Sequence, residues 1–160
     1  MLKKNLAYFA GFFDGEGCIV IGNTKHILQC SITSTTKWIL ELFRFNFNGS
    51  VSKKMKFHPS NRHDIYRWYS TGPTARIFLE AILPYLQIKR PEAEVAIRFQ
   101  LRKEGMHYPR TGHPIPNSER ILREADRILL QKMKEQVKGG FNNLELEPIE
   151  EKENDQLSLL

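Results

Sequence analysis

Two acidic residues, separated by one glycine, come directly after an apolar run near the start of the chain. Residues 6–13 are almost wholly apolar, and Asp14-Gly15-Glu16-Gly17 follows them without a spacer. A helix that is hydrophobic all round must be buried on every side, by its own domain or by a second molecule. Charge placed directly after such a helix is costly unless a metal ion or hydrogen-bond donors offset it. The segment therefore predicts two carboxylates on a rigid support, available to a cation or to donors.

Small residues occur within this predicted helix. Ala7, Ala10 and Gly11 are small, and Ala7 and Gly11 lie one helical turn apart. Such a face lets two helix backbones approach closely, a tendency best documented between membrane helices. A secretory signal is one alternative, but the run is short and interrupted by acids, and it is too short to span a bilayer. On composition alone, a core helix that ends in a glycine-rich turn is the favoured interpretation.

Length, composition and charge indicate one domain with an uneven charge distribution. The chain has 160 residues, of which 41% are hydrophobic, enough for one domain with a real core. Residues 144–160 hold six acidic residues and one lysine, so the first 143 residues carry 23 basic against 12 acidic residues, a net charge of +11. A folded part this basic indicates a polyanionic partner, whereas the acidic end is typical of a mobile, disordered tail.

The two cysteines, Cys18 and Cys30, have no metal-ligand spacing. On the strands expected here they alternate differently, so we expect no disulfide between them. Free thiols favour a reducing, intracellular setting, in the cytoplasm or an organelle, for a protein that is neither secreted nor held in a membrane.

The chain in order predicts helix, hairpin, helix, hairpin, helix. Strands are expected at 18–21 and 27–33, and at 51–57 and 64–70 around a turn at 59–62. The helix after 34–36 carries the stripe Trp38, Ile39, Leu42 and Phe43, and the helix after 71–73 carries Ile77, Phe78, Ala81 and Ile82. Two further helices at about 92–103 and 117–137 flank a long loop. This is the α+β order of a four-stranded antiparallel sheet with helices on one face only.

Strand alternation predicts what the uncovered face of the sheet presents. In the first hairpin Ile19, Ile21, Leu28, Cys30 and Ile32 point to the core, and in the second Val51, Met55 and Phe57 do so. The sidedness of 64–70 stays open, because Tyr66 and Trp68 or Arg67 and Tyr69 could form the outer pair. An ordinary solvated face is the alternative, but amides, hydroxyls and bases at two-residue spacing match base edges and phosphates, and the positive charge favours nucleic acid. The candidate DNA-binding residues are Val20, Asn23, Lys25, Gln29, Ser31, Thr33, Lys37, Ser52, Lys54, Lys56, Asn61, Arg62 and Arg67.

Two segments resemble a known family. Ala10-Gly11-Phe12-Phe13-Asp14-Gly15-Glu16-Gly17 is similar to the signature of the LAGLIDADG homing endonucleases, and Pro84-Tyr85-Leu86-Gln87-Ile88-Lys89 is similar to that family's second conserved segment. Gly49-Ser50-Val51 and Tyr66-Arg67-Trp68 also have counterparts there. The resemblance covers about residues 5–103. It implies an α-β-β-α-β-β-α core, with C-terminal helices to residue 143 in the same domain.

The resemblance also implies a homodimer. Two copies of the first helix would pack across a two-fold axis through Ala7, Ala10, Gly11 and Asp14, joining two sheets into one DNA-binding saddle. A symmetric dimer reads a palindromic or near-palindromic double-stranded DNA site. A double-strand cut also needs two sets of catalytic groups, and one motif supplies one set.

By match to the motif, Glu16 is the metal-binding carboxylate and the Gly15 carbonyl a second ligand. These hard oxygen donors suit Mg²⁺, with Mn²⁺ or Ca²⁺ as substitutes for binding. Lys89 corresponds to the family's lysine beside the scissile phosphate. Ser34 stands where the family often has glutamine, so its catalytic role is less firmly implied, and Lys37 is an alternative phosphate contact. Asp14 is expected to accept hydrogen bonds from backbone N–H groups at the dimer junction rather than to bind metal, and helix capping is its favoured role.

The sequence therefore predicts a metal-dependent, site-specific DNA endonuclease encoded by a mobile intron or intein. Two alternatives share the fold: a maturase that acts on host intron RNA, and a DNA-binding regulator that has lost catalysis.

Overall fold

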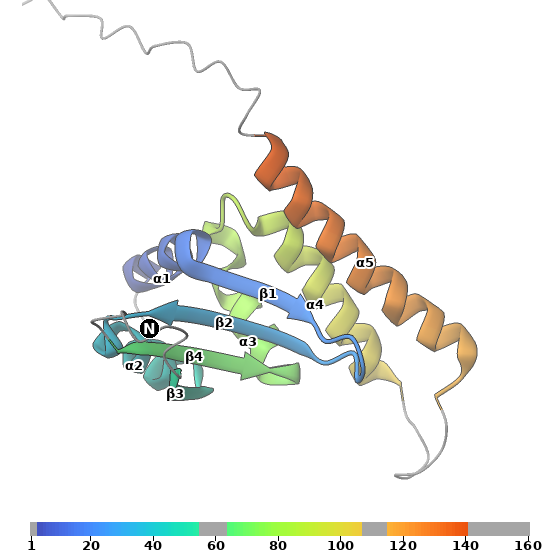
Figure 1. Cartoon of the computed structure of the whole chain (residues 1–160), viewed down its shortest axis with the longest axis horizontal. Helices are drawn as coiled ribbons and strands as arrows, with labels where there is room; N and C mark the ends of the chain where they lie inside the picture. Colours follow the sequence, from blue (N-terminus) through green and yellow to red (C-terminus); the bar gives the residue numbers. More distant parts are fainter. Residues whose placement is uncertain (1–2, 55–63, 107–114, 141–160) are drawn as a thin grey trace, which may run out of the picture.

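The structure is a computed structural model that describes residues 3–54, 64–106 and 115–140, with side chains from 6 to 136 within these ranges (Figure 1). In chain order the elements are α1 (Lys3–Glu16), β1 (Gly17–Ile21), β2 (Leu28–Ser34), α2 (Lys37–Phe47), β3 (Ser50–Lys54), β4 (Ile65–Thr71), α3 (Gly72–Ile82), the short 3₁₀ helix η1 (Leu83–Tyr85), α4 (Arg90–Gly105) and α5 (Asn117–Gly140). This confirms the predicted α+β class and the order of elements. The predicted turn at 59–62, most of the 105–116 loop and the 144–160 tail lie outside the described residues.

The four strands form one antiparallel sheet in the order β1-β2-β4-β3. Every residue assigned to the core side of the first hairpin is buried, with at most 5% of its surface exposed. Trp68 pairs with Ile32 on one side and Val51 on the other, and it is fully buried. This pairing settles the open question of sidedness, since it turns Arg67 and Tyr69 to the outer face. Helices α3 and α4 pass behind the sheet in Figure 1.

Aromatic rings fill the space between the helices and the sheet. Phe78 of α3 packs edge-on against Phe13 of α1 and Trp68 of β4, with ring centroids 5.0 Å apart in both pairs. The ring centroid of Phe43 in α2 lies 4.8 Å from that of Phe9 and 5.3 Å from that of Trp68. Edge-on pairs of this kind add to the stabilisation from burial. The cluster fixes α1 against the sheet and so fixes the point where α1 ends.

The boundaries and buried faces of three helices differ from the prediction. Helix α1 continues to Glu16, so both acidic residues lie in its last turn rather than after it. Trp38 and Leu42 of the predicted α2 stripe are exposed, as is Ile77 of the predicted α3 stripe. The other half of each stripe is buried as predicted, namely Ile39, Phe43, Phe78 and Ile82. The helices also bury Leu40 and Phe47 in α2 and Ala75 and Leu79 in α3. Helical spacing alone fixes a stripe, but a wide apolar surface allows more than one rotation.

Helix α5 packs on α4 and along the free edge of β1. Arg102 Nη2 of α4 lies 2.6 Å from Asp126 Oδ2, and Arg123 Nε lies 2.6 Å from Glu119 Oε1 within α5. Lys134 Nζ donates to the carbonyl oxygen of Ile19 at the edge of the sheet. Edge strands with unpaired carbonyls invite association with other chains, and a covering helix prevents it.

Among the described residues, no helix combines the length and apolar character that crossing a membrane requires.

The junction between α1 and β1 generates the first prediction. A Cβ atom at Gly17 would lie 2.3 Å from a ring carbon of Phe13 and 2.4 Å from the Phe13 carbonyl oxygen. Gly17→Ala should therefore lower the free energy of unfolding by about 1–3 kcal/mol, the usual cost of overpacking a core. Urea denaturation measures it. Gly105→Ala is the matched control, because no atom lies within 4 Å of its Cβ position. Equal stability of the two variants would contradict the tight junction.

Candidate active site and nucleic-acid interface

The carboxylate of Asp14 ties the end of α1 to the segment before α4. Its Oδ2 atom accepts a hydrogen bond from the backbone N–H of Gln87 at 2.8 Å, and Oδ1 accepts one from the N–H of Lys89 at 2.9 Å. The side chain is 8% exposed, so these charge-assisted bonds satisfy a buried charge. Asp14 is thus the acceptor of backbone N–H groups that the sequence suggested, and the donors belong to its own chain.

The same tie brings Lys89 to the C-terminal end of α1. Lys89 Nζ donates to the backbone carbonyl oxygen of Asp14. The last carbonyl groups of a helix have no partner within the helix and form the negative end of its dipole, which favours a cation. Residues 75 positions apart therefore meet here, and the structure places Lys89 next to the turn that carries Glu16.

Glu16 is the last residue of α1 and its side chain is exposed. No hydrogen bond or ion pair engages its carboxylate within the described part of the chain. An exposed carboxylate and the carbonyl groups of a helix end, among them that of Gly15, are hard oxygen donors of the kind that Mg²⁺ prefers. Within the described residues no three His, Cys, Asp or Glu side chains gather at a metal-binding distance.

Ser34 lies at the end of the sheet where α1 enters β1. Gly17 pairs with Ile32, so the register carries β2 two residues past the start of β1, to Ser34. Its Oγ atom accepts a hydrogen bond from the backbone N–H of Thr36 at 3.1 Å, which turns the chain into α2. The hydroxyl thus has a local structural partner, and its catalytic role stays a prediction.

Glu92 is a residue of this site that the sequence analysis did not single out. It lies in the first turn of α4, is 5% exposed, and its Oε2 atom has no hydrogen-bond partner in the described structure. Burial raises the pKa of the Glu92 carboxyl and Asp14 raises it further, while Lys134 and Lys89 act in the opposite direction. Its position directly after Pro91, where a helix begins, was the available signal.

The outer face of the sheet brings most of the predicted DNA-binding residues together. Pairing across the strands places Thr33, Arg67 and Ser52 in one row and Val20 and Gln29 in another, with Lys54 at the end of β3. Ser31 is the exception, because it is only 5% exposed and its Oγ accepts a hydrogen bond from Arg67 Nη2 at 3.0 Å. Its hydroxyl therefore orients Arg67. Tyr69, 37% exposed on this face, was missed because the sidedness of its strand was open.

The remaining candidates lie around this face. Asn23 and Lys25 are exposed at the turn between β1 and β2, and Lys37 is exposed at the start of α2, with its Nζ 5.7 Å from the centre of the Tyr66 ring. Lys56, Asn61 and Arg62 lie outside the described residues.

One face of α1 is exposed and formed by small residues. Ala7, Gly11 and Gly15 are spaced four residues apart and exposed, and no atom of the described residues lies within 4 Å of the Cβ positions of the two glycines. Ala10 is fully buried and Asp14 nearly so within the subunit. The side chains of Ala10 and Asp14 are therefore not on the exposed face of α1. Of the residues predicted for the dimer interface, Ala7 and Gly11 lie on this face, and Gly15 lies there as well.

Helix α2 carries a second exposed surface that the sequence analysis assigned in part to the core. Trp38 is 62% exposed, Leu42 39% and Phe45 84%, at the spacing of one helical stripe. Large exposed apolar stripes of this kind mark contact surfaces more often than solvated ones.

Comparison with solved structures identifies the fold. The homing endonuclease I-CvuI, solved with its DNA target and calcium, superposes with a TM-score of 0.52 over 82% of this chain and 95% of its own, at 19% identity. The archaeal intron-encoded homing endonuclease I-Vdi141I, solved with DNA, gives 0.52 over 82% and 97%, at 11% identity. The LAGLIDADG homing endonuclease I-GzeII gives 0.50 over 65% of this chain and 38% of its own, at 20% identity.

The chain has the LAGLIDADG homing endonuclease fold. No known family profile matches its sequence, and no curated protein does. Within the LAGLIDADG fold of this chain, the motif helix is α1, and its C-terminal end carries Asp14 and Glu16.

Glu92 generates the second prediction. Folding raises the pKa of the Glu92 carboxyl, so this group makes the folded state less stable as the pH rises. Below about pH 4.5 the carboxyl is protonated in both the folded and the unfolded chain and has no such effect. The loss of stability is complete once the pH exceeds the pKa in the folded state. The free energy of unfolding of Glu92→Gln should therefore be about 1 kcal/mol higher than that of the parent at pH 7, and this difference should fade towards pH 4. Glu94→Gln, on the exposed side of α4, is the control. A gain independent of pH would contradict the assignment.

Proposed function

We propose that the protein is a homodimeric, divalent-metal-dependent DNA endonuclease that makes a double-strand cut in a long, near-palindromic target. The observation that supports this most is the position of Lys89 at the C-terminal end of α1, the turn that also carries Glu16, where the two hydrogen bonds of Asp14 hold it. A carboxylate, free carbonyls and an ammonium group at one helix end suit a reaction centred on a phosphate. The neighbouring sheet face offers the polar surface that DNA requires.

The proposed metal site consists of the Glu16 carboxylate and the Gly15 carbonyl, and the donors fit Mg²⁺ because all are hard oxygens. When bound, a divalent ion supplies Lewis-acid stabilisation of phosphodiester hydrolysis. Two Glu16 side chains facing each other across a two-fold axis would repel, and a shared cation offsets that repulsion. Lys89, anchored to the carbonyl of Asp14, would offset the negative charge that develops on a phosphate bound at this helix end.

The dimer is proposed on the exposed face of α1. A stripe of Ala7, Gly11 and Gly15 allows two copies of α1 to cross closely, and a two-fold axis at this point would bring the two helix ends together. The exposed stripe of Trp38, Leu42 and Phe45 on α2 adds apolar surface for the partner, since α1 and α2 pack together through Phe9 and Phe43. Two α1 ends give the two active sites that a double-strand cut needs.

Cleavage of a target selected from a random DNA library tests the function. With Mg²⁺ present the parent should cut, and Glu16→Gln should cut at least about 100-fold more slowly while its affinity changes less than about threefold. Glu80→Gln, an exposed glutamate of α3 that pairs with Arg76, is the control and should cut normally. Undiminished cutting by Glu16→Gln would show that Glu16 holds no essential metal.

Substitution of Gly11 tests the dimer. Gly11→Phe should raise the dimer dissociation constant by about 10- to 100-fold without unfolding the subunit, because no described atom lies within 4 Å of the exposed Gly11 Cβ position and the added ring would clash with a second α1. Analytical ultracentrifugation measures it. Gly105→Phe, at an equally open glycine of α4, should dimerise like the parent. A Gly11→Phe variant that also dimerises normally would move the interface away from α1.

A further inference from the structure

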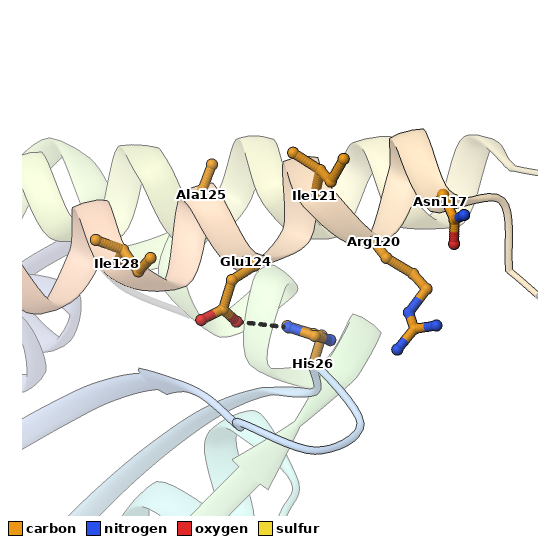
Figure 2. A pocket seen from close by; sticks show the side chains of 7 residues that line it. All are labelled: His26, Asn117, Arg120, Ile121, Glu124, Ala125 and Ile128. Carbon is orange, nitrogen blue, oxygen red and sulfur yellow. Dashed lines mark hydrogen bonds and ion pairs between the residues drawn. The ribbon is translucent and has the colours of Figure 1, made fainter.

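The turn between β1 and β2 is fastened to both C-terminal helices. Figure 2 shows the His26 ring reaching from the turn towards α5, where Nε2 lies 3.0 Å from Glu124 Oε2. The backbone carbonyl oxygen of His26 accepts a hydrogen bond from Lys103 Nζ of α4 at 2.9 Å. His26 is thus held from two directions, by Lys103, 77 positions later in the sequence, and by Glu124, 98 positions later.

Each of these groups is itself held in place. His26 has a φ angle of 45°, in the left-handed region, and the Gly22 N–H bonds to the Ile27 carbonyl at 2.9 Å, which closes the turn. Glu124 also pairs with Arg127, through Nη2 at 2.6 Å and Nε at 2.9 Å. Arg127 and His26 together lower the pKa of the Glu124 carboxyl to about 2, so it is charged at neutral pH.

Polar bonds, rather than packing, make this connection. An open pocket lies between the turn and α5, lined by Asn117, Arg120, Ile121 and Ile128 beside the His26–Glu124 pair (Figure 2). Loss of the pair therefore leaves the core untouched and removes one of the two bonds that hold the turn to the helices. The half-buried ion pair between Arg102 of α4 and Asp126 of α5 helps to keep the two supporting helices fixed to each other.

We propose that α4 and α5 hold this turn in its DNA-reading position, with His26, Glu124 and Lys103 as positioning residues that set base discrimination beneath the turn. The inference rests on the proposed function, since it takes exposed Asn23 and Lys25 at the tip as DNA contacts. It assigns a task to α5, which would act on specificity without touching DNA. A turn that moves freely would still meet phosphate but would lose the fixed geometry that a base edge requires.

Two variants weaken or remove the pair, and Glu124→Gln also weakens the bonds of Glu124 to Arg127 within α5. Glu124→Gln keeps the shape of the side chain, and His26→Asn keeps a residue that tolerates the left-handed conformation but is too short to reach α5. The control is Glu135→Gln, the same change in charge on α5 at a residue that bonds Gln131 and not the turn.

Hydrogen exchange without DNA tests the connection itself. Amides of residues 22–27 should exchange about threefold faster or more in Glu124→Gln and in His26→Asn, and those of α5 and the strands should not change. Exchange in the double variant should be little faster than in either single variant, because both single changes act on the same His26–Glu124 pair. Unchanged exchange in the turn would overturn the proposal whether or not the protein binds DNA.

Binding to every single-base variant of the selected target tests the consequence. A wrong base pair usually costs about 5- to 150-fold in affinity, and this penalty should fall by about fivefold or more at the outer positions beneath the turn. Positions read by Gln29 and Thr33 should keep their penalties, as should all positions in Glu135→Gln. A uniform loss at all positions would overturn the positioning role, whereas a parent protein without any base preference would refute the proposed function instead.

Discussion

Two hydrogen bonds to one buried carboxylate organise the candidate active site. Asp14 lies in the last turn of α1 and accepts the N–H groups of Gln87 and Lys89, so the segment before α4 cannot move independently of α1. Bonds to a charged acceptor are worth more than neutral ones, and leaving such a carboxylate buried without them would be costly. These two bonds therefore fix Lys89 beside the end of α1. Glu16 lies at the same helix end, two residues after Asp14.

The fold around this point consists of rigid parts. The aromatic cluster of Phe13, Phe43, Phe78 and Trp68 fixes α1 to the sheet, and Gly17 lets the chain turn into β1 against the ring of Phe13. The sheet then presents a polar outer face that begins where the helix ends. The chemistry and the DNA-reading surface proposed for the protein thus share one junction, and the position of a target strand on the sheet would decide where it meets Glu16.

Local patterns predicted the first hairpin well and the helix faces less well. Strict alternation placed Ile19 and Ile32 in the core, because a strand offers only two faces. Trp38 and Ile77 were misassigned, because an apolar helix can bury either of two adjacent stripes and packing decides. The resemblance assigned Glu16 and Lys89 to one active site, but it did not predict the bonds between Asp14 and Lys89. The pairing of His26 with Glu124 joins residues 98 apart and leaves no local trace. Glu92 was overlooked because an acid after a proline is ordinary at a helix start.

The central claim is that two α1 ends meet and bind divalent ions at Glu16. A crystal structure of the protein with its selected DNA duplex and Mn²⁺ tests it most directly, because Mn²⁺ can be located by anomalous scattering. The account predicts α1 crossing its symmetry mate at Gly11, with anomalous peaks within coordination distance of the Glu16 carboxylates and the scissile phosphates. Peaks elsewhere, or two Glu16 side chains facing away from each other, would contradict it.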